Sequence, residues 1–163
     1  MACCERNLET FKKDYAVLKE KYSLPSFQEL NQEFEIEDLS ETETDFLLRL
    51  IRKSLSEKTA FFSKFIEVII NPGEGGSLFA FSMAKSLAQE DRKALSEIYE
   101  KISKLQLESI KRDIAYSEKE EAIFIKKIYS FWEEAKKTLL RTLEIIDSNW
   151  DNGSKKSEKS YFR

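Results

Sequence analysis

The residues whose types most suggest binding chemistry form the glycine-rich run at 71–77, Asn-Pro-Gly-Glu-Gly-Gly-Ser, which holds three of the four glycines in the chain. Glycines ahead of a helix can present free backbone N–H groups to an anion, as phosphate-binding loops do. Such loops need a lysine directly after the last glycine, whereas this chain has Ser77 there and Glu74 adds a repelling charge. We therefore expect a plain connection, a hinge, or a loop that meets a partner. Its residues are Asn71, Pro72, Gly73, Glu74, Gly75, Gly76 and Ser77.

Catalytic and metal-binding motifs are restricted by the absence of histidine from the chain. This excludes Ser-His-Asp and Cys-His catalytic groups and HExxH zinc sites. An EF-hand calcium loop is nearly matched at 147–158, but Asn152 stands where that loop needs glycine. The acidic pairs at 120–121 and 133–134 resemble most other acids in having basic neighbours at helical spacing, which is typical of a solvated surface. We expect no catalytic residue, metal or cofactor. An enzyme that uses only Glu, Asp, Lys or Tyr is kept as an alternative.

The two cysteines, Cys3 and Cys4, are adjacent and cannot by themselves staple a domain or form a zinc site. We interpret them as part of a frayed end in a reducing compartment, with palmitoylation or a redox role as alternatives. No apolar segment has the form of a signal peptide or a membrane span. A net charge of −3 disfavours broad contact with nucleic acid. We expect a cytoplasmic protein without a membrane span.

Apolar residues at spacings of three and four predict helices along most of the chain. One such stripe predicts a first helix at about 8–22. Three Ser-x-x-Glu motifs have the form of a capping box and predict helix starts at 26–29, 40–43 and 117–120. Further helices are expected after residue 78 and from about residue 89. The stretch 35–39 is read as an extended connector or a loose turn.

These elements predict an all-α fold, an irregular bundle of five to six helices. Two of the helices are expected to be long, at about 41–70 and 118–147. We expect a single domain over 1–151. Residues 152–163 are polar and end in several basic side chains, so they are expected to form a flexible basic tail.

Large apolar side chains flank the glycine-rich run on both sides. If the two flanking helices fold back on each other, these rings form a local core. However, the run at 78–81 is apolar on more than one helix face, so the alternative is an exposed contact surface. The residues concerned are Phe61, Phe62, Phe65, Leu78, Phe79 and Phe81.

On this basis the chain is predicted to be a non-enzymatic cytoplasmic interaction or scaffold module. Its partner would be another protein or a second copy of the chain. A small protein that binds an apolar ligand, in a cavity between the aromatic helices, is the alternative from another class.

Overall fold

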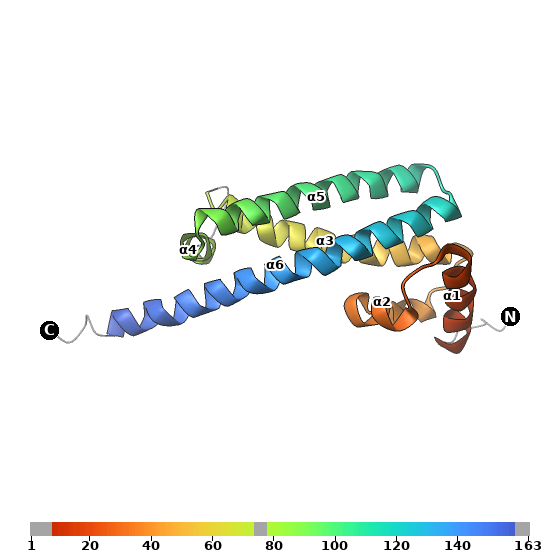
Figure 1. The fold of residues 1–163 in the computed structure, drawn as a ribbon, viewed down its shortest axis with the longest axis horizontal. Helices are drawn as coiled ribbons and strands as arrows, with labels where there is room; N and C mark the ends of the chain where they lie inside the picture. The colour runs from red at the N-terminus through yellow and green to blue at the C-terminus, as the bar shows by residue number, and fades with distance from the viewer. Residues whose placement is uncertain (1–7, 74–77, 159–163) are drawn as a thin grey trace. The chain divides into compact units, whose positions relative to one another are not determined.

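The structure is a computed structural model that describes residues 8–73 and 78–158, with side chains up to Trp150. Within these residues every regular element is a helix, which confirms the all-α prediction (Figure 1). The elements are α1 (Leu8–Tyr22), α2 (Phe27–Phe34), the 3-10 helix η1 (Ile36–Glu41), α3 (Leu47–Ile70), α4 (Leu78–Ser86), α5 (Gln89–Ile114) and α6 (Glu118–Glu158).

The chain forms two compact units. Unit 1 comprises Met1–Ala60 and Lys104–Trp132, and unit 2 comprises Phe61–Ser103 and Glu133–Arg163. Each of the three long helices, α3, α5 and α6, therefore contributes one segment to each unit. A single domain over 1–151 remains a prediction.

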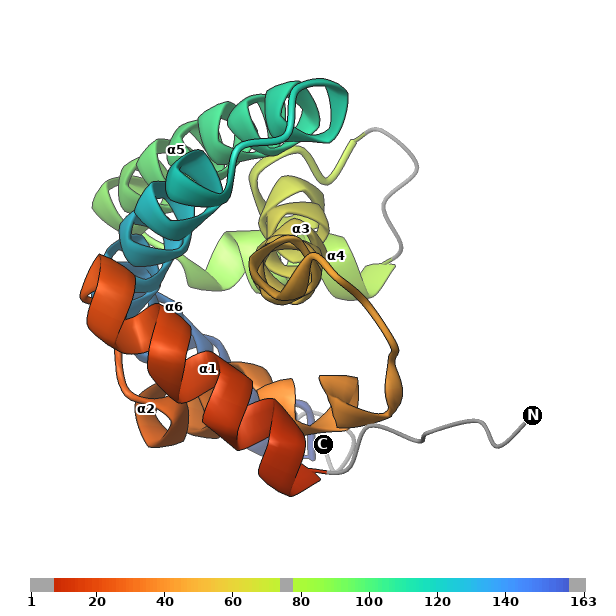
Figure 2. The same cartoon turned by 90° about the vertical axis from the view of Figure 1, so that its right-hand side faces the viewer.

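Helices α1 and α2 form where the local sequence signals place them. The apolar stripe of α1 buries Phe11 and Tyr15, and the helix stops before Ser23, which has a φ of 51°. The predicted capping box of α2 is present. The backbone N–H of Glu29 donates to Ser26 Oγ at 3.2 Å, and the N–H of Ser26 donates to Glu29 Oε2 at 2.6 Å. The two helices and η1 pack on one another in unit 1 (Figure 2).

The start of α3 differs from the prediction. The motif at 40–43 does not open the long helix, since residues 36–41 form η1 and α3 begins at Leu47. Burial of Ile36 holds η1 against the unit, and the N–H of Phe46 donates to Thr44 Oγ1 at 3.0 Å immediately before α3. The stretch read as a connector is thus largely helical, and the long helix begins six residues after the predicted position of 41.

The end of α6 was also predicted wrongly. The helix continues to Glu158 instead of ending near residue 147, so residues 152–158 of the predicted tail are helical. The other tail residues, 159–163, lie outside the described residues. In addition, α5 spans 26 residues and is a third long helix where two were predicted.

The core of unit 1 is built from the apolar stripes of α3, α5 and α6. An aromatic contact extends it towards α2, because the rings of Phe34 and Trp132 lie 5.9 Å apart and the ammonium of Lys58 lies over both. Trp132 Nε1 also donates to Glu33 Oε2 at 2.8 Å. Fully buried members of the stripes include Leu48, Ile51, Leu55, Ile125 and Ile128.

Candidate functional site

The segment of α3 in unit 2 turns small and aliphatic side chains inward. Ser63, Ile66 and Ile69 are buried at a spacing of three residues. Phe61 is 65% exposed, and its ring makes an edge-to-face contact with Phe62 at 5.3 Å. Phe62 and Phe65 are half-buried. The ring of Phe61 therefore lies on the surface of unit 2.

Helix α4 also buries small side chains and exposes large apolar ones, and the contrast is greater than in α3. The side chains that it buries are Ala80, Met83 and Ala84. Its larger apolar side chains point outward, with Leu78 89%, Phe79 55% and Phe81 42% exposed. The alanines on the buried face of α4 permit close packing against the rest of unit 2. The larger side chains of α4 therefore lie on its exposed faces.

We call the six predicted residues, Phe61, Phe62, Phe65, Leu78, Phe79 and Phe81, the aromatic surface. All six lie in unit 2, four of them exposed and two half-buried. The sequence analysis missed one neighbour of this surface, Trp150, whose ring lies 5.4 Å from that of Phe79 and is 46% exposed. Trp150 follows Ile146 by four residues and so continues the helical spacing. The prediction did not include it because the helix was expected to end at about residue 147.

The glycine-rich run is described only at its first three residues. The N–H of Asn71 still donates to Glu67 O at 2.9 Å, which extends the helical hydrogen bonding of α3 by one residue. Pro72 and Gly73 then form a turn. The expected cap at Ser77, together with Glu74, Gly75 and Gly76, lies outside the described residues.

A buried ionic group in unit 1 corrects the prediction of a solvated surface for one residue of the two acidic pairs, Glu121. Glu121 and Arg52 are both 0% exposed, and Arg52 Nε donates to Glu121 Oε2 at 2.6 Å. The same guanidinium donates to Asp113 Oδ1 and to Ser109 Oγ, each at 2.5 Å. We call Arg52, Ser109, Asp113 and Glu121 the Arg52 cluster. It joins α3, α5 and α6.

The Arg52 cluster is arranged as a structural ion pair. A second guanidinium approaches the buried carboxylate, since Arg49 Nε lies 3.8 Å from Glu121 Oε1. A carboxylate that reacts with a substrate has to be accessible to it, whereas Glu121 is 0% exposed and pairs with Arg52 and Arg49 inside unit 1. This arrangement favours a stabilising role for Glu121 over a catalytic one.

The helical spacing contained a signal for this cluster. Glu121 precedes Ile125 by four residues, in the register of the buried stripe of α6. Likewise, Ser109 follows the buried Leu105 by four residues and is itself buried, while its neighbour Ile110 is 56% exposed. Polar residues at apolar positions of separate helices are therefore candidates for pairing with one another.

Across residues 8–73 and 78–158, no group of three or more His, Cys, Asp and Glu side chains is placed to hold a metal ion. Among the helices described, none has an apolar stretch long enough to cross a membrane.

Comparison with protein-family models found no match, and neither a curated protein nor a solved structure is detectably similar to this chain.

Proposed function

We propose that this chain is a non-enzymatic cytoplasmic interaction module, and that the aromatic surface of unit 2 is where it contacts another protein or a second copy of itself. The observation that carries the proposal is that α4 places small side chains in the core and large apolar side chains on the surface, the reverse of the usual arrangement. This helix buries its alanines and exposes Leu78, Phe79 and Phe81.

The exposed side chains have the chemistry of an interface centre. Large aromatic residues bury much apolar area for few rotatable bonds, and binding energy is concentrated in such residues. Phe79 and Trp150 already contact each other, so part of the surface is ordered before a partner arrives. Burial of apolar area contributes about 25 cal/mol per Å². A partner that covers these rings would thus gain binding energy from each of them.

The test is the double variant Phe79→Ser/Phe81→Ser. Both rings are exposed, at 55% for Phe79 and 42% for Phe81, so helicity should be retained while self-association or partner capture weakens. Sedimentation velocity measures self-association, and pull-down compares the proteins retained by wild type and variant. A matched control is Leu107→Ser/Ile110→Ser, which removes two apolar side chains that are 61% and 56% exposed on α5 in unit 1.

The proposal is supported if only the Phe79/Phe81 variant loses association. It is wrong if this variant associates as wild type does, or if both variants lose association equally. Unfolding of the Phe79/Phe81 variant, seen as lost circular dichroism, would show that the rings act as core and would also contradict the proposal.

A further inference from the structure

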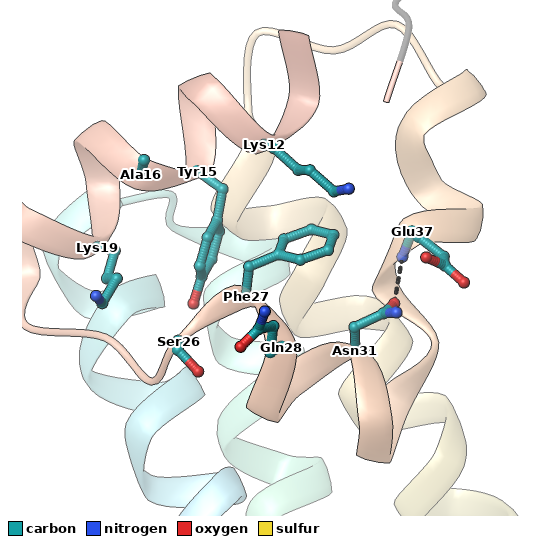
Figure 3. A pocket seen from close by; sticks show the side chains of 9 residues that line it. All are labelled: Lys12, Tyr15, Ala16, Lys19, Ser26, Phe27, Gln28, Asn31 and Glu37. Atoms are coloured by element: carbon teal, nitrogen blue, oxygen red, sulfur yellow. Dashed lines mark hydrogen bonds between the residues drawn. The ribbon is translucent and has the colours of Figure 1, made fainter. Parts of the chain in front are cut away.

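Unit 1 contains an open pocket of about 480 Å³ between α1, α2 and η1 (Figure 3). A volume of about 300–1,000 Å³ is typical of pockets that hold small ligands. The pocket belongs to a different unit from the aromatic surface, so what it binds is independent of the function proposed above.

One wall of the pocket is the ring of Phe27, which is held in place by two other rings. Phe27 makes edge-to-face contacts with Phe11 at 6.0 Å and with Tyr15 at 5.9 Å. Tyr15 is itself fixed, because its hydroxyl donates to the carbonyl oxygen of Pro25 at 2.7 Å. Burial raises the pKa of Tyr15 above its ordinary value, so the phenol stays neutral. This wall is therefore planar, apolar and uncharged.

Several of the polar groups around this wall are hydrogen-bond donors. Lys12 and Lys19 lie seven residues apart on α1, which places them on the same face of the helix. The ammonium of Lys12 lies 5.5 Å from the centre of the Phe27 ring. Asn31 Oδ1 accepts the backbone N–H of Glu37 at 2.9 Å, which leaves the amide nitrogen of Asn31 as a donor.

Negative charge at the pocket is limited. Of the residues that line it, Glu37 alone is acidic, against two lysines. Figure 3 shows the Glu37 carboxylate directed away from the Phe27 ring. Lys19 lies 4.0 Å from Glu20 in a largely exposed pair that contributes little, and after the hydrogen bonds from Ser26 it also helps to lower the pKa of Glu29. Among the side chains that line the pocket, the two lysines still outnumber the one carboxylate.

We propose that this pocket binds a small organic anion with a planar apolar body, of the aromatic carboxylate or sulfonate class. Its ring lies against Phe27, and its acidic group is held by the ammonium of Lys12 next to that ring, while Lys19 adds positive charge on the other side of Tyr15 (Figure 3). The planar wall selects for the ring, and the positive charge of the two lysines selects for the acidic group.

The experiment is an amide NMR titration of the full chain with naphthalene carboxylate, paired with the uncharged naphthalene carboxamide. We expect carboxylate-induced shifts at α1 and α2, with a dissociation constant of about 1 mM or tighter. The carboxamide should bind at least about tenfold more weakly, since it lacks the charge-assisted contact. Affinity for the carboxylate should fall as salt is raised.

Two double variants, each of which removes two positive charges, test whether the carboxylate binds at this pocket. Lys12→Gln/Lys19→Gln should weaken carboxylate binding at least about tenfold, because both cationic donors are lost. Lys13→Gln/Lys53→Gln changes two exposed lysines of unit 1 outside the pocket and should leave the affinity within about twofold of wild type. The proposal is overturned if the two variants behave alike, if the carboxamide binds as tightly as the carboxylate, or if the shifts lie away from α1 and α2.

Discussion

The substitution Arg52→Met tests how much the buried ionic group contributes to the stability of unit 1. Methionine keeps most of the aliphatic volume but removes the hydrogen bonds to Glu121, Asp113 and Ser109. The buried Glu121 would retain only Arg49, at 3.8 Å. Breaking a buried ion pair by removing one partner costs about 3–5 kcal/mol. At about 2–4 °C per kcal/mol for a chain of this size, Tm should fall by roughly 6–20 °C.

An exposed ion pair of nearly equal length serves as the control. Lys127 Nζ lies 2.5 Å from Glu108 Oε1, but its side chain is 54% exposed. Lys127→Met should therefore cost no more than about 1 kcal/mol. The double variant Arg52→Met/Glu121→Met removes both buried charges and should recover most of the loss, ending within about 2 kcal/mol of wild type.

Urea unfolding followed by tryptophan fluorescence measures these free energies. The two tryptophans lie in different units, with Trp132 in unit 1 and Trp150 in unit 2. A Trp150→Phe background therefore makes the signal specific for unit 1. The reasoning is refuted if Arg52→Met lowers the free energy of unfolding no more than Lys127→Met does. It is also refuted if the loss in the Arg52→Met/Glu121→Met variant equals the sum of the losses in its two single variants.

Three further predictions concern local features. Ser26→Ala removes the side-chain cap of α2 and should lower the free energy of unfolding by about 1 kcal/mol, measured in urea. The hydrogen bond from Lys21 is the main cause that lowers the pKa of Glu118 below its ordinary value of 4.5. The charged carboxylate therefore stabilises the fold above pH 4.5, and this stabilisation is lost as the pH falls through the lowered pKa. The Glu118→Gln variant should therefore lose less stability than wild type as the pH is lowered from about 5 to 3. Thermal melts at a series of pH values measure this difference. Ile69→Ala should cost about 2–5 kcal/mol in urea, whereas Phe61→Ala should cost less than about 1 kcal/mol because the ring is exposed; equal costs would contradict the placement of Phe61 on the surface.

The parts of the fold that the sequence predicts well depend on signals within a few residues. The stripe of α1 and the capping box at Ser26 are local, and both are found in the structure. The motif at 40–43 has the same form as the one at 26–29, yet it does not start a helix. Burial of Ile36 and formation of η1 compete with it, and such tertiary competition is not visible in a four-residue motif.

The end of α6 and the exposure of the aromatic surface depend on contacts between distant segments. Asn149 Nδ2 donates to Ser86 O at 3.0 Å, and Trp150 packs on Phe79, so α6 gains partners just beyond its predicted end at residue 147 that the polar sequence at 147–149 does not indicate. Apolar residues on two faces of α4 leave open which face is buried. The small residues Ala80 and Ala84 decide it, because they permit the closer approach of a neighbouring helix.

The Arg52 cluster also determines how the helices of unit 1 align. A shift of α6 by one turn, about 5.4 Å, would bring Arg52 opposite Ile125 in place of Glu121. The guanidinium and the carboxylate would then both be buried without each other, at a cost of several kcal/mol. Apolar stripes alone tolerate such a slip, since one leucine or isoleucine resembles the next. One charged pair at stripe positions thus selects a single register from several that the apolar side chains would accept.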